Sequence, residues 1–292
     1  MRARAPASSA NLGPGFDTLA VALSLYVEVD IVPAERLTVR AEGEGCDYPA
    51  DASHMAARVA VEVAGHDRMA ITVRSTIPVG RGLGSSAALA AAAAAAAGAA
   101  DPLAVATAID GHPDNAAASV LGGLVSATTV DGTAVAQRLP LDPGLAFVVL
   151  VPQRTLPTEE ARAALPASVP HADAAFNLGR LGLLIAGLAD RRLLVRASTE
   201  DRLHQAQRAP LFPEAPALLA GLVDAGALAS CWSGAGPSLL ALCGADAGPG
   251  LRAAGEDLLA AAGVAGRAIL LAPDLDGLVL NPPSTGTQSD LG

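Results

Sequence analysis

The sequence predicts an α+β protein, and three features of the chain support this class. Residues 1–75 read mostly as strand, because β-branched segments alternate polar and apolar positions. A glycine-rich turn then opens a long alanine-rich helix, and the last third of the chain alternates helical and strand-like segments. The same order also fits a mixed arrangement of strands and helices, and it shows no fixed repeat period.

Each element follows from its local pattern. Strands are expected where β-branched residues alternate in polarity, at residues 26–32, 37–40 and 69–75. Helices are expected in three apolar segments, at residues 55–64, 85–98 and 102–109. Gly65 ends the first helix, and the alanine run at 87–97 favours the second while letting neighbouring backbones approach closely. In the second half, a strand is expected at residues 147–151, followed by several helices. The last third is expected to alternate, with helices at 217–225 and 251–262 and strands at 229–233, 238–242 and 267–271.

Composition excludes several classes of protein. All 19 cationic residues are arginine, so the lysine on which P-loop NTPases, protein kinases and pyridoxal phosphate enzymes depend is absent. The net charge of −10 argues against nucleic acid and anionic membranes as partners. Three cysteines without a CxxC pair fit a reducing compartment. No signal-peptide core and no apolar run of membrane-spanning length occur, so we expect a soluble, cytoplasmic protein.

The segment Pro78–Ala88 carries the clearest chemistry. Its three glycines at alternate positions leave room for a ligand against the main chain. Ser85 and Ser86 are expected at the cap of the following helix, whose positive dipole end and free N–H groups suit an anion. The segment is therefore a candidate phosphate loop that needs no lysine. It also fits a glycine-rich connection ending in an ordinary cap, and its spacing fails the dinucleotide-binding fingerprint.

Three motifs in this order resemble those of the GHMP kinases: Pro6–Asp17, Pro78–Ala88 and Ser233–Ser238. The sequences SANLGPGFD and GHPDN and the pair Thr158 and Arg162 resemble the homoserine kinases within that superfamily. The resemblance implies ATP- and Mg²⁺-dependent phosphorylation of the side-chain hydroxyl of L-homoserine in threonine biosynthesis. It implies a two-lobe GHMP kinase fold and a possible homodimer. The lobes would be a ribosomal S5 second-domain-like lobe over 1–145 and a ferredoxin-like lobe over 146–280, followed by a flexible tail over 281–292.

The resemblance also assigns residues to the nucleotide. In the family the loop wraps the ATP phosphates, and the Ser233–Ser238 turn packs under it. Ser86, with Ser85 as the alternative, and Asp110 match the positions that hold Mg²⁺, and these two with Asn115 are the expected catalytic residues. The expected nucleotide-binding residues are Pro78, Val79, Gly80, Arg81, Gly82, Leu83, Gly84, Ser85, Ser86, Ala87, Ala88, Gly234 and Gly236.

Substrate residues carry over in the same way. Homoserine has an ammonium, a carboxylate and a hydroxyl, so Asp17 is expected to meet the ammonium, and Arg162 and Arg208 the carboxylate. Four residues separate Thr158 from Arg162, so on a helix they share one face. His112 is expected to position the substrate rather than act as a base, because phosphoryl transfer depends mostly on positioning and charge neutralisation. The full expected set is Asn11, Asp17, His112, Asp114, Asn115, Thr158, Arg162 and Arg208.

Simpler interpretations stay open for some of these residues. Asn11 and Asp17 could satisfy turns, and Arg162 could pair in solvent with Glu159 or Glu160. The histidines outside GHPDN are expected to be structural or at the surface: His54, His66, His171 and His204.

The chain departs from the family pattern at two places. Asp110 stands where glutamate is usual, so its shorter side chain would reach Mg²⁺ through water or after a small backbone shift. His54-Met55 stands where Asn-Leu is usual near the adenine pocket, which leaves the nucleotide preference open. A kinase for another small alcohol and a catalytically inactive ligand-binding relative are therefore the alternative functions.

Overall fold

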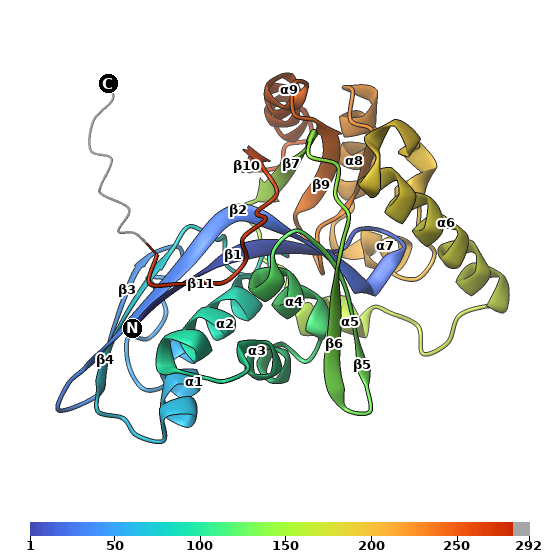
Figure 1. Ribbon diagram of the computed structural model, residues 1–292. Coiled ribbons are helices and arrows are strands. Elements are labelled where there is room, and N and C mark those ends of the chain that lie inside the picture. The colour runs from blue at the N-terminus through green and yellow to red at the C-terminus, as the bar shows by residue number, and fades with distance from the viewer. Residues whose placement is uncertain (283–292) are drawn as a thin grey trace.

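A computed structural model describes residues 1–282, and the protein it shows is an α+β fold with two sheets (Figure 1). The expected fold class is confirmed, whereas the predicted tail over 281–292 lies almost entirely outside the described residues. The first sheet has seven strands: β1 (Arg2–Asn11), β2 (Gly15–Pro33), β3 (Thr38–Gly43), β4 (Met69–Ser75), β5 (Leu124–Val130), β6 (Thr133–Leu139) and β11 (Val279–Leu280). The second sheet has four: β7 (Leu145–Pro152), β8 (Ala229–Trp232), β9 (Leu239–Gly244) and β10 (Gly266–Leu271).

The strand order pairs a late segment of the chain with the first strand. The first sheet runs β11-β1-β2-β4-β3, with β5 and β6 forming a hairpin against β2, and only β3 and β4 pair in parallel. The second sheet runs β10-β7-β9-β8 and is antiparallel throughout. Strand β11, late in the chain, returns to pair with β1 beside the N-terminus, as Figure 1 shows.

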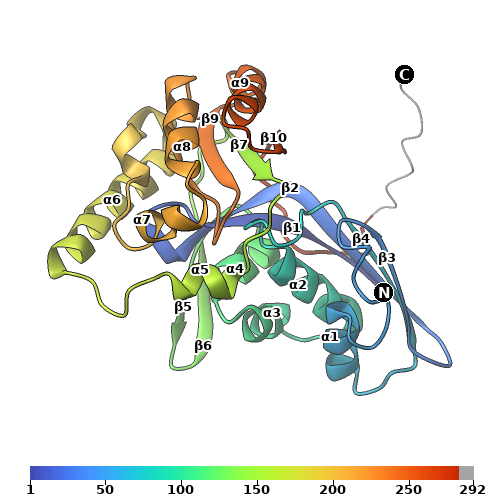
Figure 2. The same cartoon turned by 180° about the vertical axis from the view of Figure 1, so that it is seen from behind.

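Helices cover the first sheet on one face (Figure 2). The central one, α2, packs against the other three and against β1 and β2. Its alanines from Ala90 to Ala96 are at most 4% exposed, because their methyl groups let five elements approach closely. The helices of this layer are α1 (Met55–Ala64), α2 (Ser85–Ala97), α3 (Pro102–Asp110) and α4 (Pro113–Leu121).

The second sheet carries its own helices. All eight residues of β7 are buried, and α8 and α9 pack on the sheet. By length and composition alone α6 could cross a membrane, a test that helices of soluble proteins also pass. The helices are α5 (Thr158–Ala163), α6 (His171–Ala189), α7 (Gln205–Arg208), α8 (Ala215–Asp224) and α9 (Gly248–Ala261), with short 3₁₀ turns at Arg191–Leu193, Arg196–Thr199 and Ala209–Leu211.

Local signals located some elements and missed others. The helix over 55–64 has the predicted bounds and ends at Gly65, which adopts a left-handed φ of 70°. Strand β1 and the first part of β2 lie within residues 1–75, which were predicted to be mostly strand, but no bounds were given for them. Their many small alanine and serine residues carry little β-propensity, and pairing across the sheet fixes them. The β5–β6 hairpin was missed, although Asp131 and Gly132, both at positive φ, form its turn.

Candidate active site

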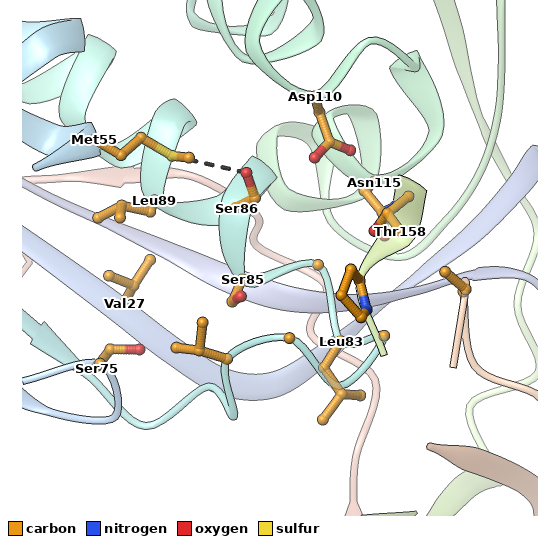
Figure 3. Close-up of a pocket in the computed structure, with 18 of the residues that line it drawn as sticks. Val27, Met55, Ser75, Leu83, Ser85, Ser86, Leu89, Asp110, Asn115 and Thr158 are labelled. Atoms are coloured by element: carbon orange, nitrogen blue, oxygen red, sulfur yellow. Dashed lines mark hydrogen bonds between the residues drawn. The ribbon is translucent and has the colours of Figure 1, made fainter. Parts of the chain in front are cut away.

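One cavity of about 490 Å³ is lined by residues from both halves of the sequence. Its walls come from the first turns of α2 and α4, the end of α3, helix α5, the adjoining ends of β1 and β2, and the segment from β3 into α1. Figure 3 shows part of this wall, with Ser86, Asp110, Asn115 and Thr158 directed toward a common space. Segments from both halves of the sequence therefore line a single cavity.

The phosphate-loop candidate ends in a glycine rather than in a serine cap. Gly84 is the N-cap of α2 with φ 64°, and Ser85 and Ser86 occupy the first helical turn. The expected serine cap is therefore wrong. A Cβ at position 84 would collide with Ser8 Oγ and lie 3.0 Å from Asn115 Oδ1, so only glycine fits there. The unpaired N–H groups of the first turn and the two serine side chains are left at the cavity.

The Ser233–Ser238 turn packs directly under this loop. Ser233 Oγ donates to the Gly82 carbonyl oxygen at 2.7 Å and lies 2.8 Å from Ser9 Oγ. A Cβ on Gly82 would overlap the Ser233 carbonyl oxygen and lie 2.8 Å from the Gly236 nitrogen. The loop therefore keeps its place only if position 82 has no side chain.

Arg81 does not face the cavity, although it stands within the loop. Its guanidinium donates to three backbone carbonyls, at Val79 (2.7 Å), Pro152 (3.0 Å) and Gln153 (2.9 Å). Two of these carbonyls lie at the end of β7 and just beyond it, so Arg81 ties the loop to the second sheet. Its charge is directed away from the expected phosphate position.

A carboxylate, an amide and a hydroxyl meet beside the start of α2. Figure 3 shows Asp110 and Asn115 facing Ser86, whose hydroxyl also contacts Met55 Sδ at 3.7 Å. Asn115 Oδ1 accepts from Ser8 Oγ at 2.8 Å. Burial raises the pKa of Asp110, although His112, Arg162 and the neighbouring polar groups oppose the shift.

Asp114 lies deeper, on the first turn of α4. It is 2% exposed, and its Oδ1 accepts the Asn115 N–H at 2.7 Å. Burial, reinforced by the negative charges of Asp17 and Asp110, raises its pKa to about 6. This end of the cavity therefore concentrates negative charge that a cation or an ammonium group would relieve.

Opposite charges are paired beside these carboxylates, at Asp17 and Arg162. Arg162 on α5 forms a two-pronged ion pair with Asp17, with Nη2–Oδ1 at 2.7 Å and Nη1–Oδ2 at 3.2 Å. Asn11 holds Asp17 by accepting its backbone N–H at 3.0 Å, and donates to the Gly234 carbonyl at 2.9 Å. The alternative that Arg162 pairs with Glu159 or Glu160 is wrong.

Arg208 has a different environment. It is 1% exposed, and its guanidinium donates to His204 Nδ1 at 3.0 Å, to the Gly234 carbonyl at 3.1 Å and to the Ala161 carbonyl at 3.3 Å. Across residues 1–282, no carboxylate lies within ion-pair distance of it. Burial, with Arg162 nearby, lowers its pKa to about 10. Arg208 is thus a buried cation that lines the cavity with no carboxylate at ion-pair distance, although Asp17 and Asp201 lie near enough to favour its charged form.

The structure brings every expected substrate residue to the cavity, together with Ser86 and Asp110. From the loop and the late turn, the lining residues are Val79, Gly80, Gly82, Leu83, Gly84, Ser85, Ser86 and Gly234, whereas Pro78, Arg81, Ala87, Ala88 and Gly236 do not line it. Sequence reasoning left out Tyr48 and Arg58, and expected His54 to be structural or at the surface and noted it as a departure near the adenine pocket. His54 caps α1 by accepting the Ala56 N–H at 3.2 Å and lines the cavity on that side.

Comparison with known proteins agrees with this arrangement. Residues 51–123 match the family described as GHMP kinases N terminal domain, and residues 176–259 match GHMP kinases C terminal. The chain is 41% identical to a homoserine kinase of Leifsonia xyli, over 94% of this chain and 90% of the relative. It is 44% identical to one of Rhodococcus opacus, over 82% and 86%.

Solved structures give the same result for the fold. A homoserine kinase from Cytophaga hutchinsonii superposes with a TM-score of 0.83 at 26% identity, covering 96% of both chains. The mevalonate kinase of L. major in complex with R-mevalonate superposes with a TM-score of 0.67 at 15% identity, over 94% of this chain and 96% of that one. The predicted two-lobe GHMP kinase fold is confirmed.

Proposed function

We propose that this chain, which belongs to the homoserine kinase family of the GHMP kinases, transfers the γ-phosphoryl group of ATP to the side-chain hydroxyl of L-homoserine. The observation that carries the proposal is the single cavity with two unlike ends. One end offers helix N–H groups and serines to phosphates, and the other offers a carboxylate and two guanidinium groups to an amino acid. The product, O-phospho-L-homoserine, places the enzyme in threonine biosynthesis.

The phosphate end suits a nucleotide triphosphate without a lysine. The N-terminus of α2 carries a partial positive charge, and its unpaired N–H groups hydrogen-bond phosphate oxygens. The Ser233–Ser238 turn under Gly82 and the Arg81 anchor hold the loop in one position. Such a preorganised loop can stabilise charge in the transition state without reorganising.

Mg²⁺ fits between this loop and α3. Ser86 and Asp110 would hold it, because both are oxygen donors and the buried Asp110 carboxylate gains from a cation beside it. No group of three or more metal-binding side chains occurs in the part of the chain that the structure describes. Mg²⁺ bound to phosphates needs only one or two protein oxygens, so the pair suffices. When bound, the ion would neutralise charge on the β- and γ-phosphates.

The amino acid would exchange with the ion pair at the other end. Its ammonium would take the Asp17 carboxylate, and its carboxylate would take Arg208 and the released Arg162. The zwitterionic amino acid would therefore replace the Asp17–Arg162 ion pair with two ion pairs, one between its ammonium and Asp17 and one between its carboxylate and the arginines. The hydroxyl would then point toward His112 and Asn115, between the two ends. We assign no general base, and the hydroxyl proton would pass to the transferred phosphate.

The remaining expectations go with this function as proposals. We keep the lobe boundary near residue 145, where β7 starts the second sheet. A cytoplasmic location, the absence of nucleic-acid and membrane partners, and a homodimer also stay predictions.

Mass spectrometry tests the function. Purified protein with Mg·ATP is incubated with L-homoserine, L-serine, L-threonine, R-mevalonate or no acceptor. The proposal expects O-phospho-L-homoserine and little product elsewhere. Phosphorylation of mevalonate instead would make it a kinase for another alcohol. Tight ATP binding without any product would make it an inactive relative.

A further inference from the structure

His204 lies behind the site rather than in it. Its side chain is fully buried, and it reaches the cavity only through Arg208, which lines it. His204 Nδ1 lies 3.0 Å from Arg208 Nη1, and its Nε2 lies 2.8 Å from the Gly13 carbonyl oxygen. One imidazole therefore connects the turn between β1 and β2 to helix α7.

These two partners fix the protonation of the ring. A guanidinium can only donate, so Nδ1 must be the acceptor. A carbonyl oxygen can only accept, so Nε2 must carry the proton. Both contacts require the same neutral tautomer, and a protonated ring would direct an N–H toward the guanidinium of Arg208.

We propose that His204 is a positioning residue that holds Arg208 as an unneutralised cation for the substrate carboxylate. The inference rests on the function proposed above and goes beyond it by assigning a role to a side chain outside the cavity.

The charges around His204 agree with a neutral ring. Burial is the main cause that lowers its pKa to about 4, and Arg208 adds to the shift, while Asp201 and Asp17 oppose it. Asp201 lies 3.7 Å from Nε2, but its carboxylate is engaged by the backbone N–H groups at the start of α7 and by Asn177. His204 thus stays neutral across the physiological range.

Neutrality matters because it keeps the charge of Arg208 available. A carboxylate in place of His204 would orient the guanidinium equally well but would cancel its charge, as Asp17 does for Arg162. Every other acceptor of Arg208 is also a neutral carbonyl. Arg208 Nη2 makes no hydrogen bond within residues 1–282, which leaves it for an incoming carboxylate oxygen.

Packing restricts the same pair. Phe16 stacks on His204 with ring centroids 5.2 Å apart and also lies 5.6 Å from the Arg208 guanidinium carbon. Because Phe16 directly precedes Asp17, any tilt of the imidazole changes the spacing between the two groups that the amino acid bridges.

Two amide variants separate this role from simple packing. In His204→Asn the side-chain oxygen takes the place of Nδ1 and keeps an acceptor for Arg208. In His204→Gln the side-chain nitrogen takes the place of Nε2 and keeps the donor to Gly13. We expect the KM for L-homoserine to rise about threefold in the Asn variant and tenfold or more in the Gln variant, since hydrogen bonds to charged groups are the stronger ones. The KM for ATP should stay within twofold in both.

The controls make each outcome decisive. His171→Gln, an exposed position on α6, should match the wild type. Circular dichroism and the Tm establish that each variant folds. If the KM for L-homoserine rises less in the Gln variant than in the Asn variant, the link to Gly13 is the one that matters. If the KM for L-homoserine and the KM for ATP rise equally, the substitution distorts the site in general. Either result overturns the proposal.

A substrate that lacks the carboxylate gives an independent test of the role of His204. 3-Aminopropan-1-ol is homoserine lacking that group, so His204→Gln should lower its kcat/KM less than twofold while lowering that of L-homoserine at least tenfold. Equal losses for the two substrates would contradict a role exerted through Arg208. A wild type inactive on L-homoserine would instead overturn the proposed function, and with it this inference.

Discussion

The two ends of the cavity are built by opposite means to bind charge in the proposed function. The phosphate end is one continuous segment, residues 79–86, held by the Ser233–Ser238 turn and aimed by the backbone of α2. The amino acid end is assembled from side chains far apart in the sequence, with Asp17 and Arg162 paired and Arg208 left unpaired. In the proposed function, the backbone groups would bind any phosphate, whereas the charged side chains would select a zwitterion. Phosphate binding would thus depend on a short stretch of sequence, whereas the choice of substrate would depend on contacts between residues far apart in the chain.

The largest expected effect is at the backbone-built end. Gly82→Ala places a methyl group against the Ser233 carbonyl oxygen, so the loop must move. We expect kcat/KM for ATP to fall about 10³-fold, because removing even one donor from a preorganised site costs 10² or more. Gly98→Ala at the other end of α2 is the matched control, since its φ is also positive but no atom lies within 4 Å of the added methyl group. Similar losses in both would mean that backbone strain, not loop position, is responsible.

Substitutions of Arg208 and Arg162 compare the contributions of the two guanidinium groups at the amino acid end. Arg208→Met should raise the KM for L-homoserine about 100-fold with little effect on that for ATP, because two charge-assisted hydrogen bonds are lost. Arg162→Met should raise it about tenfold, because Arg208 remains. The Tm should not fall in Arg208→Met, since an unpaired buried cation is removed. Equal effects of the two substitutions on homoserine would contradict the difference between a paired and an unpaired guanidinium.

Asp114 links the site to stability. The folded-state pKa of Asp114, about 6, lies above its ordinary value of 3.8, so the folded state holds a proton that the unfolded state loses between these two values. Stability contributed by this group is present at low pH and is lost as pH rises through about 6, amounting to about 3 kcal/mol. Asp114→Asn should therefore unfold at higher urea concentration than the wild type at pH 8 and at the same concentration at pH 4. If the difference in urea midpoint between Asp114→Asn and the wild type is the same at pH 4 and pH 8, Asp114 does not titrate in this pH range.

The smallest expected effect concerns Mg²⁺. Asp110→Asn removes the negative charge but keeps an oxygen beside Ser86 (Figure 3). The Mg²⁺ concentration for half-maximal rate should rise about tenfold, within the range found for altered metal ligation, while the KM for L-homoserine stays the same. Asp101→Asn, at the other end of α3, serves as the control. Unaltered Mg²⁺ dependence would remove Asp110 from the metal site.

The same contrast explains what the sequence could predict. The phosphate loop and the helix over 55–64 were located because glycine and alanine signals act over a few residues. The details of the loop could not be located, because the glycine cap depends on contact with Ser8, and the direction of Arg81 depends on carbonyls at the end of β7 and just beyond it. His204 was expected to be structural or at the surface, and its burial between Gly13 and Arg208 appears only after folding. The bounds of strand β1 could not be predicted, although residues 1–75 were expected to be mostly strand, because its small residues are fixed as a strand by pairing with β2.

A crystal structure with L-homoserine and a non-hydrolysable ATP analogue tests the central claim most directly. The account predicts phosphates on residues 79–86, the amino acid carboxylate within 3.2 Å of Arg208, a hydrogen-bond distance, and the Asp17–Arg162 pair opened around the ammonium. An intact Asp17–Arg162 pair, with homoserine bound elsewhere in the cavity, would contradict it.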